Sequence, residues 1–213
     1  METPLSKKLR KRIHLEVALL QDELVELMYD AFQQDRPVLH GGTAVWRCYS
    51  GNRFSEDLDF YAKADKDFKE LFLRATAARS LSVSKYRQTQ NLIFAKVSNG
   101  SAEVRLEVDI TKLVRSIVAE YEKVSGGRMD VYALSPEALI AEKMSAYESR
   151  RMVRDIYDIY HLSRLVKNVP GMREFLKNIK PPLDEKNLRA VVYSGVAPSF
   201  KQMIEVLSAR FSQ

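Results

Sequence analysis

The sequence predicts an α+β fold, in which a small mixed sheet flanked by helices is followed by a helical C-terminal half. Apolar residues recur every three or four positions up to Phe32, as in an amphipathic helix. Short alternating apolar segments then occupy residues 38–133, and helical spacing returns after Ser135. We therefore expect two domains, residues 1–133 with the N-terminal helices and the sheet, and residues 134–213 as a helical region.

The first half divides at its turn-forming residues. Residues 5–32 are expected to form one or two helices, and Pro37 precedes a short buried strand, Val38–His40. A Gly-Gly turn and a brief amphipathic helix follow this strand. Further strands are expected at Asp57–Tyr61, 81–86, 91–97, 103–111 and 129–133, with a helix from Asp65 to Arg79. Asn99-Gly100 favours the positive φ angles of a hairpin turn.

The second half shows clear helix signals. Ser135 is suited to cap a helix that has Pro136 at its first position. A second helix carries Asp155 and Asp158 three residues apart, on one face. Three more helices are expected at about 171–179, 184–193 and 199–211.

Composition restricts the class of protein. The chain has 213 residues, an ordinary apolar fraction and a net charge of +6. We find no stretch of about 18 apolar residues and no signal-peptide pattern, which favours a cytoplasmic protein without a membrane partner. A single cysteine excludes an internal disulfide. Basic clusters near residues 7–12 and 150–154 favour a polyanionic partner such as RNA.

Two carboxylates in the Asp57–Tyr61 strand carry the first chemical signal. Asp57 and Asp59 are separated by one residue, which in a strand places them on one face, about 6.5–7 Å apart along the chain. Hard oxygen ligands on a rigid backbone suit Mg²⁺. Gly41 and Gly42 allow a ligand to approach the backbone closely, and the helix that follows would direct its N-terminal amides at an anion. A polyphosphate site beside a metal site is the expected arrangement.

The strand Glu103–Thr111 offers a third acid. Its residues alternate, so that Glu107 and Asp109 share one face with Arg105 while Leu106 and Val108 share the other. Metal-assisted phosphoryl chemistry uses a further carboxylate to position an ion and accept the proton of the nucleophile. Glu107 and Asp109 are both candidates for this third acid.

Two blocks of sequence resemble a known family. The first is GGTAVWRCYSGNRFSEDLDF, and the second is SPEALIAEKMSAYESRRMVRDIYDIYHL. Together they resemble the AbiEii toxin family within the nucleotidyltransferase superfamily, also represented by the MenT toxins, over about residues 37–165. The matching positions of the first block are Gly41, Gly42, Thr43, Ala44, Arg53, Ser55, Asp57 and Asp59. Lys143, Arg154 and Asp158 match the second block.

The resemblance implies an NTP-dependent nucleotidyltransferase, the toxin of a toxin–antitoxin pair. It implies two Mg²⁺ ions on Asp57, Asp59 and Asp109, and further catalytic roles for Lys143 and Asp158, with the roles of Asp155 and Asp158 not separated. The residues implied for binding the NTP are Gly41, Gly42, Thr43, Arg53, Ser55, Lys143 and Arg154. The expected acceptor is the 3′ end of tRNA, and the expected protein partner is a cognate antitoxin.

Two other functions are considered. A non-catalytic module could bind a nucleotide, RNA or a partner protein on the same fold, although three convergent carboxylates that repel one another would then have little purpose. A metal-dependent nuclease would use similar acids but would leave the Gly-Gly turn and Lys143 without a role.

Overall fold

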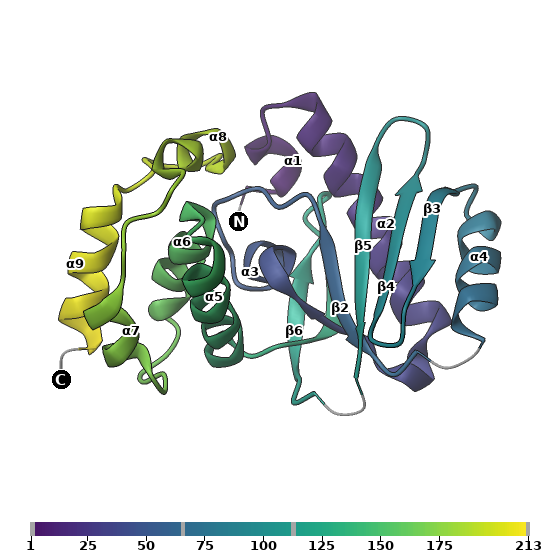
Figure 1. Ribbon diagram of the computed structural model, residues 1–213. Coiled ribbons are helices and arrows are strands. Elements are labelled where there is room, and N and C mark those ends of the chain that lie inside the picture. Colours follow the sequence, from purple (N-terminus) through teal and green to yellow (C-terminus); the bar gives the residue numbers. More distant parts are fainter. Residues whose placement is uncertain (1–2, 65–66, 112–113, 212–213) are drawn as a thin grey trace. The chain divides into compact units, whose positions relative to one another are not determined.

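The computed structural model describes residues 3–64, 67–111 and 114–211 (Figure 1). The chain divides into two compact units. The sheet unit comprises residues 1–48 and 55–134, and the helical unit comprises residues 49–54 and 135–213. The segment Tyr49–Phe54 thus belongs with the C-terminal helices, whereas the division expected from the sequence is contiguous.

Within the described residues, the sheet unit contains a seven-stranded mixed sheet of order β3-β4-β5-β2-β1-β7-β6. Strands β2 and β5 pair in parallel, as do β1 and β7, and the other neighbours are antiparallel. The strands are β1 (Val38–His40), β2 (Leu58–Ala62), β3 (Ser82–Gln88), β4 (Leu92–Ser98), β5 (Glu103–Ile110), β6 (Ile117–Glu122) and β7 (Arg128–Ala133). The α+β class predicted from the sequence is confirmed.

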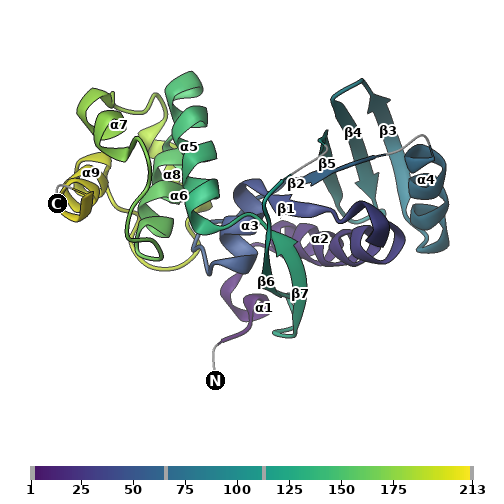
Figure 2. The ribbon, with the colours of Figure 1, turned by 90° about the horizontal axis from the view of Figure 1, so that it is seen from below.

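The helices of the sheet unit are α1 (Leu5–Lys8), α2 (Arg12–Ala31), α3 (Gly41–Cys48) and α4 (Phe68–Ala78), with a 3₁₀ turn at Gln33–Asp35. The start expected for α4, at Asp65 and Lys66, lies outside the described residues. Figure 2 shows α2 and α4 along one face of β3, β4 and β5. Leu20, Leu24 and Leu27 of α2 are fully buried, as their spacing predicts. Ile13 continues that spacing but is 53% exposed, so the buried stripe begins later than expected.

One face of the central strands is apolar and the other polar. On β2 and β5, Leu58, Phe60, Leu106 and Val108 are completely buried. Asp59, Glu107 and Asp109 alternate with them and are partly exposed. Because neighbouring residues of a strand point to opposite faces, the core-facing residues force the acids onto the other face.

The helical unit contains α5 (Pro136–Arg150), α6 (Val153–Ser163), α7 (Met172–Asn178), α8 (Leu188–Val191) and α9 (Phe200–Phe211), with a 3₁₀ turn at Glu185–Asn187. Ser135 caps α5 by accepting a 3.3 Å hydrogen bond from the Ala138 amide, as predicted. The helix expected at 184–193 is instead two short turns. It ends early because Val192 forms a β-bridge with Arg53, and Phe54 donates a 2.9 Å backbone hydrogen bond to Val191.

Among the described residues, no helix has the length and apolar character needed to cross a membrane.

Candidate active site

The carboxylates of the sheet unit lie across adjacent strands in register. Asp59 of β2 is opposite Glu107 of β5 on one side and opposite His40 of β1 on the other. Residues directly opposite each other in a sheet share a face, with Cβ atoms about 4.5–5.5 Å apart. Tyr61 is opposite Asp109 in the next row. We call Asp57, Asp59, Glu107 and Asp109 the carboxylate cluster.

Gly41 brings the first turn of α3 against Asp59. A Cβ atom on Gly41 would lie 2.2 Å from the Asp59 Oδ2 atom, so any larger residue would displace the Asp59 carboxylate. The φ angle of Gly41 is +70°, which also disfavours any other residue. The carboxylate of Asp59 therefore sits directly beside the residue at which α3 begins.

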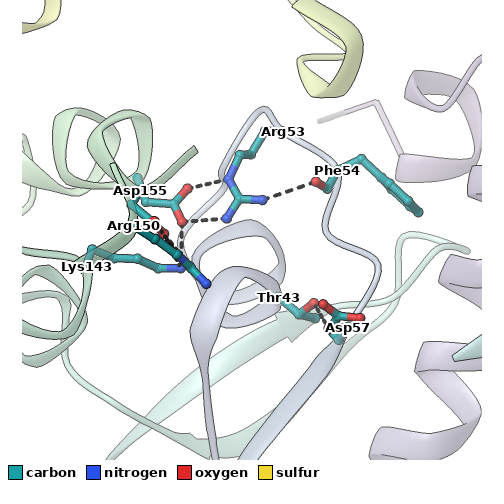
Figure 3. A network of polar contacts seen from close by, with 8 residues as sticks. Thr43, Arg53, Phe54, Asp57, Lys143, Arg150 and Asp155 are labelled. Carbon is teal, nitrogen blue, oxygen red and sulfur yellow. Dashed lines mark hydrogen bonds and ion pairs between the residues drawn. The ribbon is translucent and has the colours of Figure 1, made fainter. Parts of the chain in front are cut away.

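Contacts made by Thr43 and Arg47 also fix α3 in this position. The Thr43 hydroxyl donates a 2.5 Å hydrogen bond to the backbone carbonyl of Asp57, as Figure 3 shows. At the other end of α3, the Arg47 guanidinium lies over the rings of Trp46 and Tyr121, at 4.8 and 4.6 Å from their centroids. It also donates a 2.7 Å hydrogen bond to the Glu122 carbonyl. The Gly-Gly turn is thus anchored to both β2 and β6.

The carboxylates influence one another electrostatically. Partial burial raises the pKa of Glu107, the Arg105 guanidinium opposes this rise, and the charges of Asp59, Asp57 and Asp109 add to it. Arg105 Nη2 lies 2.8 Å from Asp57 Oδ2, and its Nε lies 3.7 Å from Glu107 Oε1. Arg105 therefore places positive charge between two acids of the cluster.

His40 and Tyr61 border the cluster. Their rings stack with centroids 3.9 Å apart, and His40 Nε2 lies 3.6 Å from Asp109 Oδ2. His40 is 8% exposed, so this stack closes the cluster on the β1 side. Ser55 is buried, and its carbonyl accepts a 2.9 Å hydrogen bond from the Gln21 side chain.

The donor set fits a divalent metal in the type of its ligands, which are carboxylate oxygens. Several partly exposed carboxylates share one sheet face. Partial burial raises the pKa of Glu107, and the charges of the neighbouring acids add to this rise. In the described part of the chain, no three acidic, histidine or cysteine side chains already have the spacing of a finished metal site. Asp57 forms an ion pair with Arg105 instead.

Residues of the second sequence block, joined by Arg53 of the first, form an ion-pair network in the helical unit. Asp158 accepts two 2.5 Å hydrogen bonds from the Arg53 guanidinium and lies 3.0 Å from Lys143 Nζ. Asp155 lies 3.7 Å from Lys143 and accepts two 2.8 Å hydrogen bonds from Arg150. Figure 3 shows Arg150 and Lys143 converging near Asp155. Both carboxylates are completely buried and Arg53 and Lys143 are buried as well, whereas Arg150 at the edge of the network is exposed. We call these five residues the buried ion network.

Charge balance within this network sets its protonation. Burial alone would raise the pKa of Asp158, but Arg53 and Lys143 outweigh burial and hold it below its usual range. The pKa of Arg53 is raised because the attraction of Asp158 exceeds the opposing effect of burial. Arg53 and Asp158 thus form a stable ion pair inside the unit.

Lys143 differs from the position expected of it. We predicted that it projects from the edge of the buried face of α5, but its side chain is itself buried, with 6% of the residue exposed. The reason is that α6 places two carboxylates in the interior, and these attract the ammonium group. Arg154, in contrast, is exposed. The phosphate-binding roles of Arg53, Lys143 and Arg154 stay predictions.

A family model matches residues 24–188, and its description is nucleotidyl transferase AbiEii toxin of a type IV toxin–antitoxin system. The chain belongs to the AbiEii family of nucleotidyltransferase toxins. Both the carboxylate cluster and the buried ion network lie inside the matched residues. The resemblance stated from the two sequence blocks is therefore confirmed, and the chain is a nucleotidyltransferase.

Solved structures share the AbiEii-type fold. The nucleotidyltransferase toxin MenT4 from Mycobacterium tuberculosis is 20% identical, with a TM-score of 0.61 over 92% of this chain and 82% of MenT4. JHP933 from Helicobacter pylori is 18% identical, with a TM-score of 0.62 over 94% of this chain and 90% of its own. A comparison with curated protein sequences gives no significant match.

Sequence reasoning did not include Arg105 among the site residues. The one sequence feature that could have indicated Arg105 was the alternation of the strand, which places it on the same face as Glu107 and Asp109. The sequence also could not show that Arg53 and Asp158 pair, because they are 105 residues apart in the chain.

Proposed function

We propose that this AbiEii nucleotidyltransferase moves a nucleoside monophosphate from an NTP to a hydroxyl at the 3′ end of tRNA, in a Mg²⁺-dependent reaction opposed by a cognate antitoxin. The observation that carries the proposal is Asp59. Its carboxylate shares a face with those of Glu107 and Asp109 and lies against the first residue of α3. Carboxylate oxygens beside the backbone amides of a helix N-terminus support the proposal of a metal site next to a phosphate site.

Mg²⁺ would be held by Asp57, Asp59 and Asp109, with Glu107 as the alternative third acid. When bound, it would neutralise the triphosphate and make the acceptor hydroxyl more acidic. The amides of Gly42 and Thr43 would bind phosphate oxygens. The hydroxyl of Thr43 already donates to the Asp57 carbonyl, so its role is to hold the loop in place.

The chemical step forms a bond from the acceptor oxygen to the α-phosphorus and breaks the bond to the β-phosphate, which leaves as pyrophosphate. The proton of the acceptor hydroxyl passes to Asp109 or Glu107. The raised pKa of Glu107 suits a proton acceptor, and the contact of Asp109 with His40 would orient that carboxylate. Positioning and charge neutralisation supply most of the rate, as in other phosphoryl transfers.

The buried ion network keeps donors for a ligand. Lys143 has three N–H donors, and Arg53 has five, three of which are used by Asp158 and the Phe54 carbonyl. We propose that Lys143 and Arg53 supply positive charge to the β- and γ-phosphates, and that Ser55 supplies a hydrogen bond. Lys143 and Arg53 would keep their ion pairs with Asp158 while doing so. Arg154 is proposed as an outer phosphate contact.

The test incubates the protein with total tRNA, Mg²⁺ and each α-³²P-labelled NTP in turn, with Asp59→Ala as control. Label on tRNA with the wild type, absent with the variant, is the expected result and names the donor. No label with any NTP would contradict tRNA as the acceptor. Melting temperatures with Mg²⁺ and NTP would then show whether the donor site is intact.

A further inference from the structure

The open face of β3, β4 and β5 carries basic and aromatic side chains in the same rows as the acids. Arg87 of β3 is opposite Phe94 of β4, which is opposite Glu107 of β5. Glu107 is in turn opposite Asp59. One continuous row therefore runs from Arg87 on the edge strand β3 to the carboxylate cluster.

The neighbouring row is entirely basic. Lys85 of β3 is opposite Lys96 of β4, which is opposite Arg105 of β5. Arg105 contacts Asp57 at 2.8 Å. Both rows thus lead from basic residues at the edge to an acid of the cluster.

The side chains of β3 in these rows point away from the core. Tyr86, which lies between Lys85 and Arg87 in sequence, contacts Phe72 of α4, with ring centroids 6.2 Å apart. Because alternate residues of a strand point to opposite faces, Lys85 and Arg87 lie on the face away from α4. Both are exposed, and Phe94 is half-buried with Lys85 Nζ 5.3 Å from its ring centroid.

This pattern fits a nucleic acid strand. Cations spaced along two strands match successive phosphates, and an aromatic ring between them offers a surface on which a base can stack. Lys96 is partly neutralised by Glu103 at 2.7 Å, which leaves Lys85 and Arg87 as the main source of positive charge. A small acceptor would use neither the length of these rows nor the sheet edge.

We propose that the open face of β3–β5 binds the backbone of a single-stranded RNA segment and directs its 3′ hydroxyl to the carboxylate cluster. Lys85 and Arg87 contact phosphates, and Phe94 supports a base. This inference rests on the proposed function, because it assumes an RNA acceptor, and it adds the surface by which that acceptor is recognised.

The test measures binding of 5′-fluorescein-labelled total tRNA by fluorescence anisotropy at several salt concentrations, without NTP. Lys85→Glu/Arg87→Glu is expected to weaken binding at least about tenfold and to reduce the salt dependence by the equivalent of about two phosphate contacts. The control, Lys69→Glu/Arg74→Glu, makes the same charge change on exposed positions of α4 and is expected to keep most of the affinity. Equal losses in both pairs, an unchanged affinity in the β3 pair, or no binding by the wild type would each overturn the proposal.

Two additional measurements test whether a loss of RNA binding has another cause, namely aggregation or a damaged NTP site. Charged residues on an edge strand also oppose pairing between sheet edges, so size-exclusion chromatography must show the β3 variant to be monodisperse. If it is not, the milder Lys85→Gln/Arg87→Gln variant replaces it, with an expected weakening of about threefold or more for two lost contacts.

The melting-temperature shift with Mg²⁺ and NTP is expected to be unchanged in the variants. RNA binding that depends on β3 but gives no labelled product would contradict the proposed reaction and leave the binding surface supported.

Discussion

The carboxylate cluster and the buried ion network use the same residue types in opposite ways. In the cluster, acids share an open sheet face, and their mutual repulsion helps to raise the pKa of Glu107. In the network, two completely buried acids are matched by cations, and the pKa of Asp158 is lowered. The comparison teaches that charge balance and burial, not residue identity, separate partly exposed acids that repel one another from buried acids that are held in ion pairs.

The largest expected effect is on stability. Asp158→Ala would leave Arg53 and Lys143 buried without their main counter-charge, at a cost of about 3–5 kcal/mol in the free energy of unfolding. Urea denaturation measures this change. Glu205→Gln, which removes an exposed ion pair with Lys201, is the control and should change stability by less than about 0.5 kcal/mol. A similar small change for Asp158→Ala would refute the structural role of the network.

The contact between Gly41 and Asp59 gives the next effect. Gly41→Ala would impose a left-handed strain of about 1–2 kcal/mol and push the Asp59 carboxylate away, so transfer activity should fall as well as stability. Gly100→Ala is a matched control, because its φ is +88° but nothing lies within 4 Å of the added Cβ. It should lose stability alone. Full activity in Gly41→Ala would show that the position of Asp59 is unimportant.

Arg105 neutralises part of the negative charge of the carboxylate cluster. Removing the guanidinium in Arg105→Gln should free Asp57 and strengthen Mg²⁺ binding by about two- to fivefold, the range of an exposed ion pair. Isothermal titration calorimetry with Mg²⁺ alone measures the affinity. Lys96→Gln removes the same charge one strand away but contacts Glu103 instead, so it controls for long-range attraction. Equal gains in both variants would exclude a specific role for Arg105.

The smallest effect is a pH dependence of stability. Since the pKa of Glu107 is raised in the folded state, its ionised form destabilises the fold at neutral pH, and this penalty disappears as the pH falls toward its ordinary value of 4.5. Glu107→Gln should therefore raise the melting temperature at pH 7 by about 1–2 °C and by progressively less in acid. Glu103, whose pKa is lowered by its hydrogen bonds to Lys96 and Ser84, provides the contrast. Glu103→Gln should lower the melting temperature at pH 7, and a shift of the same sign in both variants would contradict this account.

The sequence predicted features that depend on local rules. Alternation on β5 placed Glu107 and Asp109 on one face, the Asn99-Gly100 turn joined β4 to β5, and Ser135 capped α5. Features that depend on distant partners were not predictable. The break after α8, for example, arises from the bridge between Val192 and Arg53. β6 was also missed, although its partner β7 follows it directly in the chain.

The same distinction applies to the site. The Asp57-x-Asp59 pattern and the Gly-Gly turn were visible in one short stretch, but the register between β2 and β5 was not. That register places Glu107, rather than Asp109, directly opposite Asp59. The burial of Lys143 likewise depends on how α6 packs on α5, which no spacing within either helix reveals.

The most direct test of the central claim measures Asp59→Asn in two ways, by transfer of α-³²P-labelled nucleotide to tRNA and by melting temperature. If the carboxylate cluster is a ligand site, transfer should fall by at least about 100-fold, the range for loss of a key charge-stabilising group. The melting temperature should stay the same or rise, because one repelling charge is removed. A variant that keeps its activity, or that unfolds as Asp158→Ala is expected to do, would contradict the account.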